Sequence, residues 1–347
     1  MKNILVTGAG GLIGSEAVRF FAKNKTNRVY GIDNNMRMEF FGKDGDVSSV
    51  LAELSLLSNY QHLENLDIRD REGVNLQFSL IKPDAIVHCA AQPSHDKAAS
   101  IPHVDFEVNA NGTMNLLEAT RQHAKDSPFV FCSTNKVYGD GPNTVRLIES
   151  EKRYDFYNPE YIDGIPETFS VDNCMHSLFG ASKLAADIMC QEYGKYFDMN
   201  VGIFRGGCLT GPQHKAVELH GFLTYIVNCA VVGKKYNIFG YKGKQVRDQI
   251  HSSDVLSAFS AFIDNPKKGE VYNIGGCKGN SASILEIVDI LEEKFGYELH
   301  HDYVHQNRAG DHICYYSDMS KFKEHYPSWS IKYLLDDIVS EIIESIA

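Results

Sequence analysis

Three glycines near the amino terminus, Gly8, Gly11 and Gly14, form the first pattern with chemical meaning, because they follow a short apolar run and open an amphipathic one. This spacing lets the backbone turn sharply and approach a pyrophosphate, which then sits on the unpaired amides of a helix N-terminus. A plain glycine turn would have the same composition. Asp33, which ends the next apolar run, favours a dinucleotide, since a carboxylate there accepts hydrogen bonds from both ribose hydroxyls. The pattern therefore predicts bound NAD, and Arg37 leaves NADP open.

The elements that must position these residues alternate along the first half of the chain. Short apolar runs are followed by longer amphipathic ones, which is typical of βαβ units with a parallel sheet covered on both faces. We predict an α/β fold with a Rossmann-like, doubly wound parallel sheet. Its strands are expected at Asn3–Val6, Arg28–Ile32, His62–Asp67, Ala85–Cys89, Phe129–Cys132 and Val201–Phe204, and its helices at Leu12–Asn24, Val74–Ile81, Phe106–Ala124 and Phe179–Tyr196.

The regular alternation of strands and helices ends at about Arg205. From there on, short strands and loops separate helix-like stretches at His220–Val232, Asp254–Ile263 and Ile284–Phe295. We therefore predict a Rossmann domain at 1–205, with a crossing back near 240–265, and a smaller α+β substrate lobe at 206–347. Residues 143–173 are polar and aromatic and are expected to form a long loop, which in a compact domain is usually functional; a decorated surface loop is the plain alternative.

Composition excludes several classes of protein. The net charge of −11 opposes nonspecific attraction to nucleic acid or to an anionic membrane, and no apolar run reaches the ~18–20 residues of a membrane span. The eight cysteines are scattered without a C-x-x-C pair, which predicts reduced thiols and a cytoplasmic protein. The fourteen histidines show no metal-ligand spacing, so no metal is assigned.

Several motifs taken in order resemble those of one protein family. The start TGAGGLIG, the pair Asp67-Ile68, the run His88-Cys89-Ala90-Ala91 and the run from Asn109 to Thr113 look like the extended short-chain dehydrogenase/reductase superfamily of nucleotide-sugar epimerases and dehydratases. The resemblance covers nearly the whole chain. It implies that the cofactor is contacted by Gly8, Gly11, Leu12, Ile13, Gly14, Asp33, Asn34, Asp67, Ile68, Ala90, Ala91, Gln92, Asn109 and Lys183.

Motifs later in the chain narrow the range of expected substrates. Thr134, in STNKVYGD, matches the position of a catalytic hydroxyl that hydrogen-bonds the reacting sugar oxygen. GKQVRD and NRAGD place Arg247 and Arg308 where the family grips the nucleotide diphosphate, and guanidinium forks suit phosphate oxygens; a surface ion pair is the plain alternative for each. The further substrate contacts implied by the resemblance are Cys208, His220, Phe222 and Phe239. These motifs and the 143–173 insert are most similar to the CDP-tyvelose (CDP-paratose) 2-epimerase branch.

That resemblance implies an NAD-dependent epimerase that inverts C2 of a CDP-sugar by transient oxidation to a 2-keto sugar. One position departs from the family pattern, because Phe179 occupies the slot of the usual catalytic tyrosine in FGASK, whereas Lys183 is retained. Phenylalanine cannot accept a proton. A natural branch with another base, an engineered Tyr→Phe variant and a binding protein without catalysis all explain the residue, and the natural branch is narrowly favoured.

Candidates for a replacement base are His176, which lies three residues before Phe179, and Cys208, which follows a predicted strand at the ligand edge. His95 and Lys183 itself are further candidates. The alternative functions are another nucleotide-sugar epimerase or a 4,6-dehydratase, which needs an acidic pair where Asn135 and Lys136 stand, or a sensing scaffold of the same fold. The resemblance also implies a homodimer or homotetramer that assembles through the helices at 106–124 and 179–196.

Overall fold

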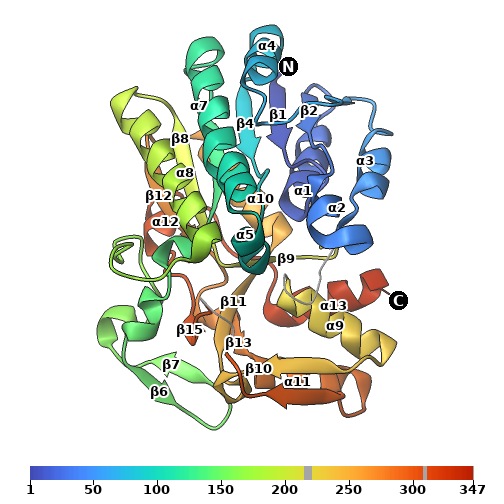
Figure 1. Cartoon of the computed structure of the whole chain (residues 1–347), viewed down its shortest axis with the longest axis vertical. Helices are drawn as coiled ribbons and strands as arrows, with labels where there is room; N and C mark the ends of the chain where they lie inside the picture. Colours follow the sequence, from blue (N-terminus) through green and yellow to red (C-terminus); the bar gives the residue numbers. More distant parts are fainter. Residues whose placement is uncertain (215–220, 308–310, 347) are drawn as a thin grey trace. The chain divides into compact units, whose positions relative to one another are not determined.

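A computed structural model describes residues 1–214, 221–307 and 311–346 of the chain. They form two compact units, each assembled from three separate chain segments (Figure 1). The first, which we call the Rossmann unit, comprises residues 1–134, 178–205 and 255–272. The second unit comprises the described parts of 135–177, 206–254 and 273–347. Residues 135–177, inside the range predicted for the Rossmann domain, thus belong to the second unit, and the return to the Rossmann unit spans 255–272.

A seven-stranded sheet forms the centre of the Rossmann unit, in the order β12-β8-β5-β4-β1-β2-β3 (Figure 1). Strands β1 to β5 pair in parallel around β1, with Val6 opposite both Gly31 of β2 and Val87 of β4. The Rossmann-like α/β fold predicted from the alternating pattern is confirmed. The strands are β1 (Asn3–Thr7), β2 (Arg28–Ile32), β3 (Tyr60–His62), β4 (Ala85–His88), β5 (Phe129–Thr134), β8 (Val201–Gly206) and β12 (Glu270–Ile274).

Helices cover this sheet, and their apolar faces and the sheet share one core. Phe78, Leu116, Leu117, Phe129 and Phe131 belong to that core and are fully buried, so helix and strand periodicities both present apolar side chains to the same interior. The helices are α1 (Leu12–Ala22), α2 (Met36–Phe41), α3 (Ser48–Leu54), α4 (Arg71–Ile81), α5 (His95–Ser100), α6 (Pro102–Phe106), α7 (Gly112–His123), α8 (Ser177–Tyr196) and α10 (Ser252–Asp264).

Several predicted boundaries differ from the structure, and two of these differences have an identifiable backbone cause. The strand expected at His62–Asp67 is β3, which ends at His62, because Asn65 adopts a positive φ of 59° and turns the chain out of the sheet. The single helix expected at Phe106–Ala124 begins earlier, in α6, and contains a π-helical turn at Glu107–Asn111 before α7. Such turns are often found at functional sites.

The second unit is built on short strands packed against helices. Strand β11 (Val246–His251) pairs with β9 (Cys208–Thr210), β13 (Ser281–Ser283) and β15 (Cys314–Tyr315), and β10 (Tyr236–Phe239) pairs with β14 (His301–Val304). The predicted loop at 143–173 contains a hairpin of β6 (Leu147–Glu149) and β7 (Tyr154–Phe156). The helices are α9 (Phe222–Val232), α11 (Ile284–Phe295), α12 (Ser320–His325) and α13 (Leu335–Ile346). In the described ranges, no helix has both the length and the apolar character that crossing a membrane requires.

Candidate active site

The glycine turn after β1 is packed too tightly for a side chain at Gly8 or at Gly14. Gly8 has a φ of +71°, and a Cβ there would lie 2.7 Å from the backbone nitrogen of Ala90. A Cβ on Gly14 would overlap the carbonyl oxygen of Gly8, so α1 lies directly against the turn. Gly11 occupies the N-cap of α1 and has no side chain to cover the amides of the first helical turn. These are the features that let a backbone approach a pyrophosphate.

Asp33 stands at the end of β2 beside this turn. Its Oδ2 accepts from the Gly10 amide at 2.8 Å and its Oδ1 from the Asn35 amide at 2.8 Å, while the side chain stays half-buried. The carboxylate is therefore fixed in orientation and still reachable from solvent. Burial lowers the pKa of the Arg37 guanidinium, and Asp33 partly offsets that effect. Arg37 lies over the Phe41 ring at 4.8 Å.

Asp67 and Ile68, two of the predicted cofactor contacts, follow β3. The amide nitrogen of Asn34 donates to Asp67 at 2.8 Å, and Arg69 binds the same carboxylate through two nitrogens. Burial acts to raise the pKa of Asp67, but the hydrogen bonds from Arg69 and Asn34 outweigh it and lower the pKa. Ile68 is buried, and its side chain fills the space beside Gly112, where a Cβ would lie 2.6 Å from Cδ1.

A chain of hydrogen bonds links the Ala90 amide to the Asn109 carbonyl. The Ala90 amide donates to Thr7 Oγ1 at 3.2 Å, and Thr7 Oγ1 lies 2.7 Å from Nδ1 of His88. His88 Nε2 lies 2.8 Å from Thr113 Oγ1, which donates to the Asn109 carbonyl at 2.6 Å. Because the Thr113 hydroxyl donates its proton to that carbonyl, it accepts a hydrogen bond from His88. His88 therefore carries its proton on Nε2 and accepts from Thr7 on Nδ1. Burial, with a smaller contribution from Lys183, lowers the pKa of His88 well below its ordinary value.

Asn109 joins the Gln92 segment to α8. Its Oδ1 accepts from the Gln92 amide at 2.9 Å, and its Nδ2 donates to Ser182 Oγ at 3.0 Å. Ser182 and Gln92 both donate to Asp105, a buried carboxyl whose pKa is raised by its burial. Sequence reasoning missed Asp105 and Ser182. Their signals were the i, i+4 spacing of Asp105 to Asn109 on one helix face and the position of Ser182 next to Lys183.

Thr134, Phe179 and Lys183 lie in the Rossmann unit, at the end of β5 and on α8. Lys183 Nζ donates to the Cys132 carbonyl at 2.8 Å and lies 4.2 Å from the centre of the Phe131 ring. Its burial lowers its pKa. Phe179 is 7% exposed, and its ring centre lies 5.1 Å from that of His95. The structure thus brings His95, one of the candidate bases, into contact with Phe179.

A buried ion pair fixes α8 against the sheet. Arg205 of β8 binds both oxygens of Asp187 on α8, at 2.9 and 3.1 Å, and Ser133 of β5 donates to the same carboxylate at 2.7 Å. Removing one partner of such a buried pair is costly, because the other charge is left without compensation. These three residues therefore hold Lys183 in place relative to β5, and sequence reasoning did not single them out.

The other predicted residues belong to the second unit. His176 Nε2 lies 2.9 Å from the Val137 carbonyl, and Cys208 is the first residue of β9. Burial raises the pKa of the Cys208 thiol to about 12, so it is a thiol and not a thiolate at neutral pH. Phe222 begins α9 and Phe239 ends β10. His220 and Arg308 lie outside the described residues.

Arg247 is buried in β11 and surrounded by oxygen acceptors. Its guanidinium donates to the Val246 carbonyl at 2.7 Å, to the His312 carbonyl and to the Asp311 carboxylate. Burial opposes the charge, but Asp311 outweighs it and the pKa of Arg247 is raised. Lys136 lies 3.7 Å from the same carboxylate. Two cations therefore share one carboxylate, which leaves a local charge suited to an anion.

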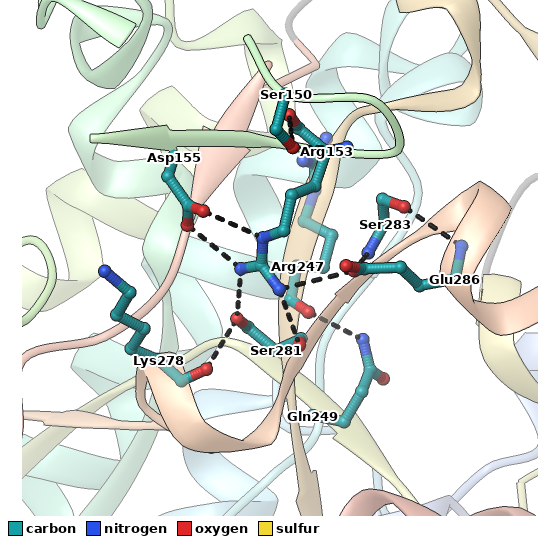
Figure 2. A network of polar contacts seen from close by, with 9 residues as sticks. All are labelled: Ser150, Arg153, Asp155, Arg247, Gln249, Lys278, Ser281, Ser283 and Glu286. Atoms are coloured by element: carbon teal, nitrogen blue, oxygen red, sulfur yellow. Dashed lines mark hydrogen bonds and ion pairs between the residues drawn. The ribbon is translucent and has the colours of Figure 1, made fainter. Parts of the chain in front are cut away.

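The strand that carries Arg247 is braced by the 143–173 insert. Figure 2 shows Arg153, which directly precedes β7, with its guanidinium between Asp155, Ser281 and Glu286. It donates to Asp155 at 3.0 Å and to Ser281 Oγ at 2.9 Å, and Glu286 lies at 3.3 Å. Since Ser281 lies on β13, which pairs with β11, the insert holds the sheet around Arg247.

No three histidine, cysteine, aspartate or glutamate side chains gather closely enough to hold a metal ion within 1–214, 221–307 and 311–346. None of the eight cysteines, all of which lie in the described ranges, forms a disulfide.

Comparison with known proteins supplies the family. The model of the NAD dependent epimerase/dehydratase family matches residues 4–275. The chain belongs to this family. It is 30% identical to CDP-paratose 2-epimerase of Salmonella typhi over 98% of both chains, and 31% identical to dTDP-glucose 4,6-dehydratase of Escherichia coli over 84% of this chain and 77% of that one. A crystal structure of UDP-glucuronic acid 4-epimerase from Bacillus cereus, with UDP-glucuronic acid and NAD, is 25% identical, with a TM-score of 0.80 and coverage of 99% and 98%.

Membership of the epimerase/dehydratase family confirms NAD as the cofactor and the recognition made from the motifs. The residues fit that group. The space at Gly8 and Gly14 excludes side chains, and the Asp33 carboxylate is held by two amides and remains half-buried at the end of β2. When bound, NAD supplies a hydride acceptor and donor to this family's reactions. The departure at Phe179 concerns the proton and not the cofactor, because the aromatic ring and Lys183 are both in place.

Proposed function

We propose that the chain is an NAD-dependent nucleoside-diphosphate-sugar epimerase that inverts C2 of a CDP-sugar. The observation that carries the proposal is the similarity to CDP-paratose 2-epimerase, which extends over 98% of both chains. The dehydratases of Escherichia coli and Haemophilus influenzae match over 77% and 90% of their own lengths. In addition, Asn135 and Lys136 stand where a 4,6-dehydratase needs an acidic pair, and an amide and an ammonium cannot replace two carboxyl groups in acid–base work.

Each unit supplies part of the proposed chemistry. In the Rossmann unit, Asp33 orients the adenosine ribose, Lys183 binds the nicotinamide ribose, and Thr134 hydrogen-bonds the hydroxyl at C2 of the sugar. Oxidation at C2 gives a 2-keto sugar, and reduction from the opposite face gives the epimer without net redox change. In the second unit, Arg247 and Lys136 bind the diphosphate. Asp311 forms ion pairs with both side chains and fixes their positions. Cys208, Phe222 and Phe239 are proposed to contact the substrate as well.

The proton of the C2 hydroxyl needs an acceptor other than Phe179. Two of the candidate groups, His95 and Lys183, lie in the same unit as Phe179, and His95 is packed against its ring. An imidazole titrates near neutral pH and suits this role. Cys208 suits it poorly, because its burial keeps the thiol protonated. We therefore place His95 first among the bases to test, ahead of His176.

Turnover with a panel of CDP-, UDP-, GDP- and dTDP-sugars deuterated at C2 tests the function. We expect a C2 epimer, detected by NMR, only from a CDP-sugar, with deuterium retained because the hydride never exchanges with solvent. A 4-keto-6-deoxy product would identify a dehydratase. Binding of sugar nucleotides without product from any of them, with NAD bound, would favour the scaffold alternative over an enzyme.

The proposed assembly is a homodimer or homotetramer through α7 and α8. These helices lie side by side (Figure 1), and Tyr193 of α8 donates to Glu118 of α7 at 3.1 Å. Met114, Leu178 and Ile188 are exposed apolar residues on them, and such patches commonly mark interfaces. Light scattering should show a dimer or larger species that Ile188→Asp weakens, and a monomeric native protein would contradict the proposal.

A further inference from the structure

Cys89, which directly follows β4, and Cys132, which lies on β5, occupy neighbouring positions. The parallel register pairs Ile86 with Phe129 and His88 with Phe131, so the next pair in the same register is Cys89 and Cys132. Neighbouring strands lie about 4.8 Å apart, and a disulfide spans Cα separations of roughly 4.4–6.8 Å. The backbone therefore already holds the two residues at a distance that a disulfide can bridge.

The two thiols are also coupled to each other and to a cation. The hydrogen bond between them raises the pKa of Cys89 and lowers that of Cys132, while burial acts to raise both pKa values and Lys183 acts to lower both. Lys183 Nζ donates to the Cys132 carbonyl at 2.8 Å, so its charge is fixed beside this pair. Because a thiolate is the reactive form of cysteine, Cys132 is the attacking thiol and Cys89 the resolving one.

The place of this pair in the fold gives it a consequence. Cys89 directly precedes Ala90, whose amide donates the first hydrogen bond of the chain that leads through Thr7 and His88. Cys132 lies two residues before Thr134. Both residues are partly exposed. Cys190, by contrast, is a buried residue.

We propose that Cys89 and Cys132 form an oxidation-sensitive dithiol that a peroxide converts to a disulfide, and that bound NAD protects it. The Cys132 thiolate attacks one peroxide oxygen, the O–O bond breaks, and the departing hydroxide takes up a proton, which leaves a sulfenic acid and water. The Cys89 sulfur then attacks the Cys132 sulfur, the S–O bond breaks, and the Cys89 proton leaves with the oxygen as a second water. Two electrons pass from the thiol pair to the peroxide.

The disulfide disturbs the cofactor site through two contacts. It replaces the hydrogen-bonded thiols next to Lys183, and it fixes the ends of β4 and β5 where Ala90 and Thr134 emerge. We therefore expect the oxidised protein to bind NAD at least tenfold more weakly than the reduced protein. The protection by NAD rests on the proposed contacts of the cofactor with Ala90, Ala91 and Gln92, whereas disulfide formation itself does not.

The test treats cofactor-free protein with hydrogen peroxide and maps its peptides without reduction. A Cys89–Cys132 linked peptide should form, saturating NAD should slow its formation at least tenfold, and dithiothreitol should restore NAD affinity. Cys89→Ala should accumulate a sulfenic acid on Cys132 that dimedone traps, and Cys132→Ala should trap none on Cys89. Cys277→Ala, at a partly exposed cysteine of the second unit, should behave as the unaltered chain.

Absence of the linked peptide would overturn the proposal even if both alanine variants failed to fold, because it is measured on the unaltered chain. Equal rates with and without NAD, or unchanged NAD affinity after the link has formed, would overturn it as well. No sugar nucleotide is present in these measurements. A failed dithiol would therefore leave the proposed epimerase activity standing, and a protein without epimerase activity would leave the dithiol standing.

Discussion

Mild acid should destabilise the Rossmann unit through His88, because both nitrogens of its neutral ring already have hydrogen-bond partners. Nε2 donates to Thr113, Nδ1 accepts from Thr7, and burial lowers the pKa of the ring well below its ordinary value. In the unfolded chain the same imidazole titrates near 6.5. As the pH falls below that value, the unfolded chain binds a proton that the folded chain does not, so stability is lost.

The size of the effect follows from this difference. One proton costs about 1.4 kcal/mol of stability for each pH unit below roughly 6.5, which gives a loss of about 2 kcal/mol between pH 7 and pH 5. Urea unfolding at both pH values measures it. In His88→Gln the loss should shrink by about 2 kcal/mol, whereas His103→Gln, at an exposed position of α6, should keep the full pH dependence.

An unchanged pH dependence in His88→Gln would refute the reasoning. If that variant does not fold, the titration of the His88 Cε1 proton in the unaltered chain decides the question. We expect its NMR shift to stay constant from pH 7 to pH 5. A midpoint near the ordinary imidazole value would show that the folded ring accepts a proton after all.

Three further predictions concern the site. The chain should bind NAD in clear preference to NADP, and Asp33→Asn should weaken NAD binding in a titration by on the order of 10–100-fold, since a charge-assisted hydrogen bond contributes ~1.5–3 kcal/mol; equal affinity of the unaltered chain for both dinucleotides would contradict this. Arg247→Ala should weaken sugar-nucleotide binding by a similar ~1.5–3 kcal/mol and leave NAD binding intact, which calorimetry can measure; unchanged affinity for every sugar nucleotide would remove Arg247 from the proposed site. In a natural branch, Phe179→Tyr should change turnover little and His95→Ala should abolish it. Activity that appears only in the tyrosine form, with the ~10²–10⁴-fold gain typical of a general base, would instead indicate an engineered position.

Much of the Rossmann unit could be predicted because its determinants are local. Gly8, Gly14 and Asp33 lie within one βαβ unit, and each residue type there has a direct steric or electrostatic reason. The strand boundary at His62 could not be predicted, because it depends on a left-handed backbone at Asn65. The three-residue strands of the 143–173 hairpin are too short for a period-2 pattern to be distinct from a loop.

The contacts that join distant segments were out of reach of sequence reasoning. Arg247 was singled out by its motif, but its partner Asp311 lies 64 residues away along the chain. Asp105 accepts hydrogen bonds from Gln92 and Ser182. It lies on the helix that contains the π-helical turn, and no amino-acid composition distinguishes such a turn from an ordinary α-helix. A sequence pattern predicts which face of an element is buried, whereas pairing between elements is decided by the tertiary fold.

The order in which the chain threads its two units has a consequence for synthesis. Strand β12 is the edge neighbour of β8, yet the chain builds much of the second unit between them. A ribosome adds roughly 5–20 residues each second, so β8 presents an unpaired edge for several seconds before β12 emerges. Such edges recruit strands from other chains. Aggregation during expression should therefore be most severe for truncations that end between β8 and β12, and a fragment that stops at residue 205 should need a chaperone or a separately supplied β12 segment to stay in solution.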